Sequence, residues 1–173
     1  LEPKELPQVL AEAFYLAKNG RPGPVVIDIP WDVQQAVCIP EFIEHPCLHR
    51  VVADMTPKEE DVSALREMLK ESRRPCVFAG GGIIHSNAAQ ELLTFAETYQ
   101  IPVATSLMGV GAFPEDHRLS LKWLGMHGSY AANKAVHECD LLIGIGVRFS
   151  DRVTGDIKKF APHAKIVHVD IDP

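Results

Sequence analysis

The sequence predicts an α/β fold, a doubly wound and Rossmann-like parallel sheet, and three observations support this prediction. Short apolar runs of strand length recur along the chain, at 75–79, 101–106, 141–146 and 165–171. Segments with helical periodicity separate most of these runs. Glycines and polar residues directly follow the runs, as expected where parallel strands end at a ligand-binding edge. Because strands that alternate with helices are joined by right-handed crossovers, the sheet should be parallel.

The first 55 residues form a separate piece in this prediction. Residues 7–19 place four apolar side chains on one helical face, and Asn19 and Gly20 should end this helix. The four side chains are those of Leu10, Ala13, Phe14 and Ala17. The β-branched run 25–29 then predicts a strand. Residues 31–55 contain two prolines and no sustained period, which indicates an extended connection between domains.

The second piece begins with a helix start signal. Residues 56–59, Thr-Pro-Lys-Glu, predict a capping box with proline at the first helical position. The helix behind it should turn four apolar residues toward the core, namely Val62, Leu65, Met68 and Leu69. Asn87 with Gln90 should cap the next helix. The inner face of that helix should hold Ala89, Leu92, Leu93 and Ala96. Residues 107–118 predict a loop, and residues 128–138 predict a further helix.

Composition argues against several function classes. The chain has 17 Lys and Arg against 23 Asp and Glu, so the net charge of −6 disfavours a nucleic-acid partner. The four cysteines form no C-x-x-C pair, and His163 and His168 lack ligand spacing, so we predict neither a metal site nor a disulfide framework. Because the sequence shows no signal-like or membrane-spanning segment, we expect a cytoplasmic protein without a membrane partner.

The loops after the predicted strands, and the segment 124–128 before a predicted helix, carry the candidate binding residues. They are Gly80, Gly81, Gly82, Gly125, Met126, His127, Gly128, Gly144, Gly146, Arg148 and Asp170. Glycines let a ligand approach the backbone, and a helix that follows them can receive a phosphate. Met126 offers an apolar contact for a ring, and Asp170 could accept hydrogen bonds from ribose or ribityl hydroxyls. Each loop could also be only a packed turn, but several on one edge favour a ligand site.

Arg152, next to Asp151, has two interpretations. It could form a solvated surface ion pair with little effect, or its guanidinium could bind a carboxylate of a ligand. No nucleophile elbow, H-E-x-x-H or P-loop pattern occurs in the sequence. The residues alone therefore indicate a dinucleotide-sized ligand site without an evident catalytic group.

Five motifs stand in order along almost the whole chain, at 20–30, 80–82, 101–114, 124–128 and 148–155. The last two read Leu-Gly-Met-His-Gly and Arg-Phe-Ser-Asp-Arg-Val-Thr-Gly. Taken together, the motifs resemble the catalytic large subunit of acetolactate synthase, also called acetohydroxyacid synthase, in the thiamine diphosphate enzyme family. Within that superfamily, the last two motifs are specific to this enzyme.

The resemblance implies a piece of a larger enzyme. Residues 1–32 resemble the last helix and strand of the pyrimidine-binding domain, and residues 33–55 resemble a linker. Residues 56–173 resemble the central FAD-binding domain, cut before its carboxyl end. The family's catalytic glutamate would lie before Leu1, and its diphosphate and Mg²⁺ motif after Pro173. The piece alone is therefore expected to be inactive.

The resemblance also implies an activity, cofactors and partners. Family members condense two pyruvates, or pyruvate and 2-oxobutyrate, with loss of CO₂, in the biosynthesis of valine, leucine and isoleucine. Their cofactors are thiamine diphosphate, Mg²⁺ and FAD, although the net reaction needs no electron carrier. They are homo-oligomers, dimers or tetramers, and can bind a regulatory small subunit. In a eukaryote the protein would lie in an organelle.

The family's site residues carry over to matching positions. Arg152 matches the arginine that favours the acceptor carboxylate and contacts herbicide inhibitors. The FAD-binding positions are Arg21, Gly80, Gly81, Gly82, Ser106, Leu107, Met126, His127, Gly128, Gly146, Val147, Arg148 and Asp170. The chain departs from the family at Trp31, where a lysine near the active-site mouth is usual, and at Ser150, where aspartate is usual. These departures affect the expectations for inhibitor sensitivity, substrate access and one flavin or loop contact.

Two other functions stay open on the sequence alone. The chain could be a non-catalytic nucleotide-binding or scaffold module that kept the fold without the chemistry. It could also belong to another thiamine carboligase, such as glyoxylate carboligase, although the stretch 148–155 disfavours this alternative. Sequence beyond both ends would separate the scaffold from the enzyme, because only the enzyme requires the upstream glutamate and the downstream metal motif.

Overall fold

The computed structural model describes residues 2–41 and 56–171. The chain divides after Thr56 into two compact units, and each is described by itself. The predicted domain boundaries near residues 32 and 55 remain a prediction, because residues 42–55 lie outside the described residues.

The amino-terminal unit contains one long helix. A 3₁₀ turn, Pro3–Glu5, leads into α1, Leu6–Lys18, which confirms the helix predicted over 7–19. The end of α1 agrees with the predicted stop. The Asn19 N–H donates to the Tyr15 carbonyl oxygen over 3.0 Å, and Gly20 follows with a φ of +68°.

The strand predicted over 25–29 was wrong, because these residues form no regular element. An extended segment becomes a strand only by pairing with a neighbour, and this one pairs with no strand in the described part of the chain. Val26 is accordingly 90% exposed. The short helix α2, Trp31–Gln35, also interrupts the predicted extended connection.

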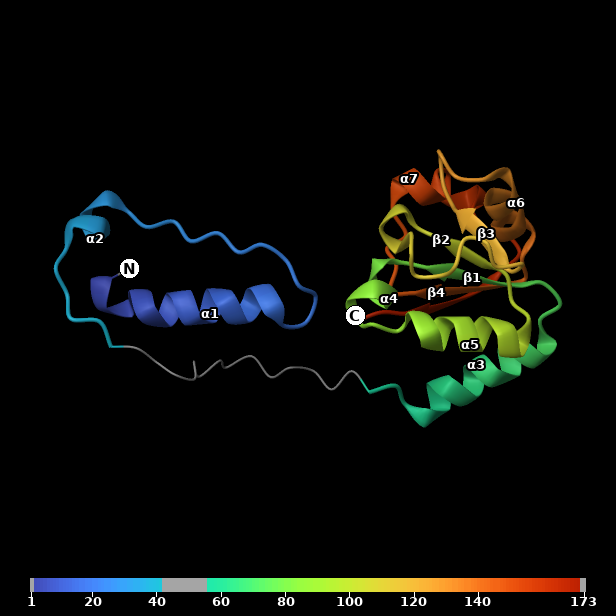
Figure 1. The fold of residues 1–173 in the computed structure, drawn as a ribbon, viewed down its shortest axis with the longest axis horizontal. Helices are drawn as coiled ribbons and strands as arrows, with labels where there is room; N and C mark the ends of the chain where they lie inside the picture. Colours follow the sequence, from blue (N-terminus) through green and yellow to red (C-terminus); the bar gives the residue numbers. More distant parts are fainter. Residues whose placement is uncertain (1, 42–55, 172–173) are drawn as a thin grey trace. The chain divides into compact units, whose positions relative to one another are not determined.

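The carboxyl-terminal unit is built on a five-stranded parallel sheet, which confirms the predicted doubly wound α/β class (Figure 1). The strands lie in the order β3-β2-β1-β4-β5. Their bounds are Pro75–Ala79 for β1, Val103–Thr105 for β2, Ser120–Trp123 for β3, Leu141–Ile145 for β4 and Lys165–Val169 for β5. Four of these strands were predicted, with ends that differ by at most two residues.

The sequence analysis missed β3. This strand lies at one edge of the sheet, and none of its side chains is fully buried. Its pairing with β2 is irregular between Val103 and Ala104, and Lys122 has a φ of +63°. A short, half-exposed edge strand carries no apolar run, so periodicity could not reveal it.

Each face of the sheet has its own apolar core. Along β1, Val77 and Ala79 point into one core, whereas Cys76 and Phe78 point into the other. This alternation is the period of two expected for a strand that is buried on both faces. The helices α3 and α5 lie on one side of the sheet, and α6 and α7 lie on the other (Figure 1).

Three helices of this unit, α3, α5 and α6, were predicted, whereas the short helices α4 and α7 were not. Their bounds are Glu59–Glu71 for α3, Gly81–His85 for α4, Ala89–Tyr99 for α5, Tyr130–Glu138 for α6 and Asp151–Thr154 for α7. The predicted capping box is absent, because α3 starts at Glu59 and the Glu59 carboxylate pairs with Arg66 over 3.5 Å. The predicted cap Asn87 was also wrong, because Ala88 occupies the N-cap of α5 and Asn87 has a φ of +57°.

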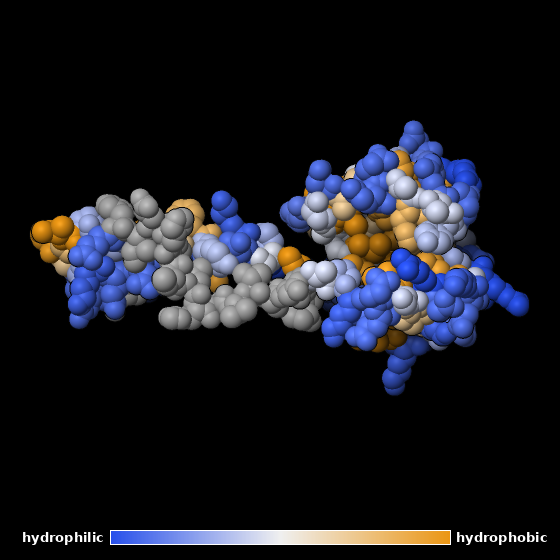
Figure 2. Space-filling model, turned by 90° about the horizontal axis from the view of Figure 1, so that it is seen from below, coloured by the Kyte–Doolittle hydropathy of each residue, from blue (hydrophilic) through white to orange (hydrophobic). Residues whose placement is uncertain are grey.

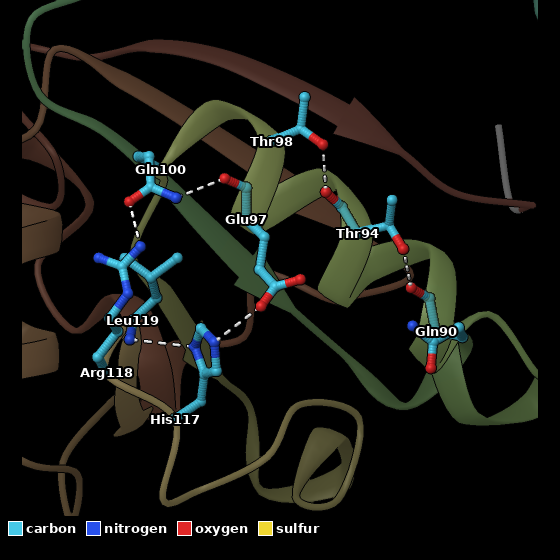
Figure 3. Close-up of polar contacts among 8 residues, drawn as sticks. All are labelled: Gln90, Thr94, Glu97, Thr98, Gln100, His117, Arg118 and Leu119. Atoms are coloured by element: carbon cyan, nitrogen blue, oxygen red, sulfur yellow. Dashed lines mark hydrogen bonds and ion pairs between the residues drawn. The ribbon is translucent and has the colours of Figure 1, made fainter.

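Polar contacts attach the loop between β2 and β3 to the end of α5 (Figure 3). The imidazole of His117 lies between the two, with Nε2 3.3 Å from the Glu97 carboxylate and Nδ1 accepting from the Leu119 N–H over 3.2 Å. The Arg118 guanidinium donates to the side-chain oxygen of Gln100. These contacts hold in place a loop whose first residues belong to the candidate site.

Figure 2 shows that hydrophilic residues cover most of the visible surface of the carboxyl-terminal unit, with small apolar patches between them. The acidic and basic residues of α3 are exposed, in agreement with an amphipathic helix on this face. Among the described residues, none of the helices has both the length and the apolar character needed to span a membrane.

Candidate functional site

The predicted binding loops gather at the carboxyl edge of the parallel sheet. The connection after β1 leads toward β2 on one side, whereas β4 lies on the other side of β1. The boundary between β1 and β4 is therefore the topological switch point, where doubly wound sheets bind their ligands. Residues that follow the five strands in turn are Gly80–Gly82, Ser106 and Leu107, Met126–Gly128, Gly146–Arg148, and Asp170.

Close backbone contacts between the β1 and β4 loops explain the glycines at the switch point. A Cβ on Gly80 would lie 2.1 Å from the carbonyl oxygen of Gly146. A Cβ on Gly82 would lie 2.6 Å from the Cα of Gly146. The Gly80 N–H donates to the carbonyl oxygen of Ile145, and the Gly82 N–H donates to the carbonyl oxygen of Gly146, each over 2.9 Å. These two N–H groups are therefore committed to the protein, and the glycines shape the floor of the site.

Exposed apolar side chains occur in the loops that follow β2 and β3. Leu107 is 65% exposed and Met126 is 68% exposed. Met108, which the sequence analysis overlooked, is 73% exposed and contacts Gly81, whose Cβ would lie 3.2 Å from the Cβ of Met108. Apolar side chains that stay exposed to solvent suit contact with the flat ring of a ligand.

Ser106 belongs to the structure of the site as well as to its candidate ligand residues. Its N–H donates to the Ala79 carbonyl oxygen over 2.8 Å, and its hydroxyl accepts from the Gly109 N–H over 3.1 Å. The serine therefore fixes the start of the loop after β2 against the end of β1.

The loops after β4 and β5 are joined by a histidine that the sequence analysis did not assign. The His168 Nε2 donates to the Val147 carbonyl oxygen over 2.8 Å and lies 3.5 Å from the Asp170 carboxylate. Val147 is only 3% exposed, so its side chain is part of the core and only its backbone can meet a ligand. Arg148 beside it is exposed. Strand periodicity gave no signal for the role of His168.

Arg152 lies at the same edge, on α7. The Met126 N–H donates to the Arg152 carbonyl oxygen over 3.1 Å, which joins the loop after β3 to α7. The Asp151 carboxylate accepts from the backbone N–H of Arg152 over 2.9 Å. Within the described residues the Arg152 guanidinium has no ion-pair partner, so the structure does not favour the surface ion pair.

Three further residues from the sequence analysis lie in the amino-terminal unit or at the start of α7. Arg21 lies in the amino-terminal unit, exposed after α1, and its assignment to the site stays a prediction. Trp31, at the first position of α2, is also exposed in that unit. Ser150 occupies the N-cap of α7, where its side chain makes no capping hydrogen bond. Over residues 2–41 and 56–171, no group of three or more His, Cys, Asp or Glu side chains could hold a metal ion.

Comparison with known proteins identifies the family of the carboxyl-terminal unit. The family model for the central domain of thiamine pyrophosphate enzymes matches residues 62–173. A solved structure, from a Mycobacterium smegmatis protein described as a thiamin diphosphate-dependent enzyme, superposes with a TM-score of 0.69. It shares 24% identity over 96% of this chain and 32% of its own, which supports the fold.

Two curated relatives match the chain along its whole length. "Probable acetolactate synthase large subunit" of Methanocaldococcus jannaschii is 51% identical over 99% of this chain. "Acetolactate synthase 1, chloroplastic" of Zea mays is 50% identical over 100% of this chain. The chain spans only 30% and 27% of the lengths of these two relatives.

Proposed function

Since this chain belongs to the thiamine pyrophosphate enzyme family and carries its central domain, we propose that the protein is the catalytic large subunit of an acetolactate synthase. The observation that carries the proposal is the identity of about half of all residues, along the whole chain, with relatives of that name. Neither of the two curated relatives is named as a glyoxylate carboligase or a scaffold protein, so those alternatives are not favoured.

The proposed reaction joins two small 2-oxo acids. Two pyruvates give acetolactate and CO₂, and pyruvate with 2-oxobutyrate gives acetohydroxybutyrate and CO₂. Bound thiamine diphosphate, with Mg²⁺, supplies the nucleophilic carbon and the electron sink that decarboxylation needs. Arg152 suits the recognition of the acceptor, because a guanidinium without an ion-pair partner in the described chain can bind a carboxylate with two parallel hydrogen bonds.

We also propose that the carboxyl edge of the sheet binds FAD, and the residues present there fit this cofactor. The side chains of Leu107 and Met126 offer apolar contact to a ring system, and Asp170 offers a carboxylate to hydroxyl groups. The residues that would hold FAD are Arg21, Gly80, Gly81, Gly82, Ser106, Leu107, Met126, His127, Gly128, Gly146, Val147 (through its backbone), Arg148 and Asp170.

The flavin proposal predicts that the full-length protein purifies yellow and releases FAD on denaturation. Met126→Asp, which replaces an exposed apolar side chain with a charge, should lower the FAD content with little loss of stability. Tyr130→Asp, at another exposed residue nearby in the sequence, is the matched control and should keep the flavin. A colourless protein that is fully active contradicts the proposal.

The acceptor proposal predicts that Arg152→Ala weakens the preference for 2-oxobutyrate over pyruvate. A charged hydrogen bond contributes about 1.5–3 kcal/mol, which corresponds to a loss of roughly 10- to 100-fold in acceptor capture. Competition between the two acceptors, with product analysis, measures this preference directly. Arg66→Ala, at an exposed arginine on α3, is the control. An unchanged product ratio removes Arg152 from this role.

The remaining proposals concern partners and location. We propose a homo-oligomer, a dimer or tetramer, with a regulatory small subunit as partner, since the Methanocaldococcus jannaschii relative is named as a large subunit. The cytoplasm is the proposed location, or an organelle if the organism is a eukaryote. Gel filtration with light scattering, with and without a co-expressed small subunit, tests the assembly.

A further inference from the structure

We propose that Asn133 and Gly125 are positioning residues for Arg152, and that they thereby set the preference for 2-oxobutyrate over pyruvate as acceptor. The inference rests on the proposed function of Arg152 in binding the acceptor carboxylate. It is carried by contacts that join β3, α6 and α7 through the loop 124–128.

Gly125 lies directly against the backbone of α7. Its φ is +117°, and an added Cβ would lie 2.9 Å from the carbonyl oxygen of Arg152 and 3.3 Å from the Cα of Val153. The neighbouring Met126 N–H donates to the same Arg152 oxygen over 3.1 Å. A side chain at position 125 would therefore displace Arg152 or break this hydrogen bond.

Asn133 holds the same loop from α6. Its side-chain nitrogen donates to the carbonyl oxygens of Gly125, over 3.1 Å, and Ser129, over 2.9 Å. Since both neighbours can only accept, the amide must turn its NH₂ group toward them. The Gly128 N–H donates to the Gly125 oxygen as well, over 2.9 Å. Two donors thus fix the orientation of the Gly125 carbonyl.

The Gly125 carbonyl and the Met126 N–H belong to one peptide unit, which connects Asn133 to Arg152. Because this unit is planar and trans, its carbonyl and its N–H point in opposite directions. Asn133 therefore holds one side of the peptide plane, and Arg152 is bonded to the other side. The exposed Arg152 guanidinium has no ion-pair partner in the described chain, so its backbone is the part that these contacts position.

The test measures acceptor preference in the full-length enzyme loaded with FAD, thiamine diphosphate and Mg²⁺, in mixtures of pyruvate and 2-oxobutyrate. Asn133→Asp keeps the shape of the side chain but removes its donors, whereas Asn133→Gln keeps them. We expect Asn133→Asp to weaken the preference about 2- to 10-fold, the range for one hydrogen bond, and Asn133→Gln to lie nearer the wild type. Added to Arg152→Ala, Asn133→Asp should have no further effect.

A pair of glycine variants tests the other half of the inference. Gly125→Ala and Gly111→Ala both place alanine at a positive φ, of +117° and +95°. A Cβ on Gly111 meets nothing within 4 Å, whereas one on Gly125 meets Arg152. Only Gly125→Ala should therefore change the acceptor preference. This comparison decides the inference if Asn133→Asp does not fold.

The outcomes separate the inference from the function on which it rests. If Arg152→Ala shifts the preference but neither Asn133→Asp nor Gly125→Ala does, the inference is overturned and the proposed function stands. It is also overturned if Asn133→Asp acts equally with and without Arg152, because the asparagine then acts elsewhere. An enzyme that forms no acetolactate contradicts the proposed function, and the inference with it.

Discussion

At the scale of single residues, Asp140 connects parts of the chain that are far apart in sequence. Its carboxylate accepts from the Ser72 hydroxyl, from the Arg73 N–H over 2.8 Å and from the Arg74 N–H over 3.0 Å. Burial raises the pKa of this carboxyl, but these hydrogen bonds, together with one from the backbone of Asp140 itself, outweigh burial and lower the pKa below its ordinary value. The aspartate before β4 thus fixes the turn between α3 and β1.

We predict that Asp140→Asn destabilises the protein by about 1–3 kcal/mol near neutral pH, because the charged acceptor is lost. Because the pKa of Asp140 is lower in the folded than in the unfolded protein, its ionised carboxylate stabilises the fold at any pH above the ordinary pKa of an aspartate. This stabilisation is lost as the pH falls through the pKa that Asp140 has in the folded protein. The difference between wild type and variant should therefore shrink below about pH 4. Thermal denaturation across pH measures it, with Asp116→Asn in an exposed loop as control. A difference that is constant with pH contradicts this account.

The buried cysteines of the second core should be unreactive. Burial raises the pKa of the Cys139 thiol to about 11 and shifts that of Cys76 upward as well. Cys38, in contrast, is exposed. At pH 8, iodoacetamide should alkylate Cys38 in the native protein and reach Cys76 and Cys139 only after unfolding, as read by peptide mass spectrometry. Native labelling of Cys76 at the rate of Cys38 contradicts the described core.

At the scale of elements, the sequence predicts those whose signal is local. The apolar run 75–79 matches β1 at both ends, and α1 differs from its prediction by one residue. The strand over 25–29 failed because pairing decides a strand, and no neighbour in the described chain supplies it. The edge strand β3 was missed for the opposite reason, since pairing with β2 makes a strand from residues without an apolar run.

The contact between the β1 and β4 loops gives a prediction at this scale. Gly80→Ala should destabilise the carboxyl-terminal unit by about 1–3 kcal/mol, because the added methyl would meet the backbone of Gly146 at 2.1 Å. The same variant should retain less FAD. Gly23→Ala, where a Cβ meets nothing within 4 Å, is the control in thermal denaturation. Equal midpoints for the two variants contradict the described contact.

At the scale of the whole molecule, the sequence predicts which loops form the site better than it predicts what each residue does there. Topology alone brings the residues after parallel strands to one edge, so Gly80 and Arg148 could be grouped in advance, whereas the strand before Met126 was missed. The contacts that join these loops depend on the directions of side chains and backbone groups, which the periodicity of a sequence does not predict. For that reason His168 was not assigned to the site, and Val147 was assigned although its side chain is buried.

The most direct test of the central claim is acetolactate formation from pyruvate by the full-length protein. The assay contains thiamine diphosphate and Mg²⁺ and is run with and without FAD, on protein stripped of flavin. The account predicts that acetolactate appears with all three cofactors and falls when FAD is withheld. If no acetolactate forms with all three present, the proposed function is contradicted, and if withholding FAD changes nothing, the flavin site is contradicted.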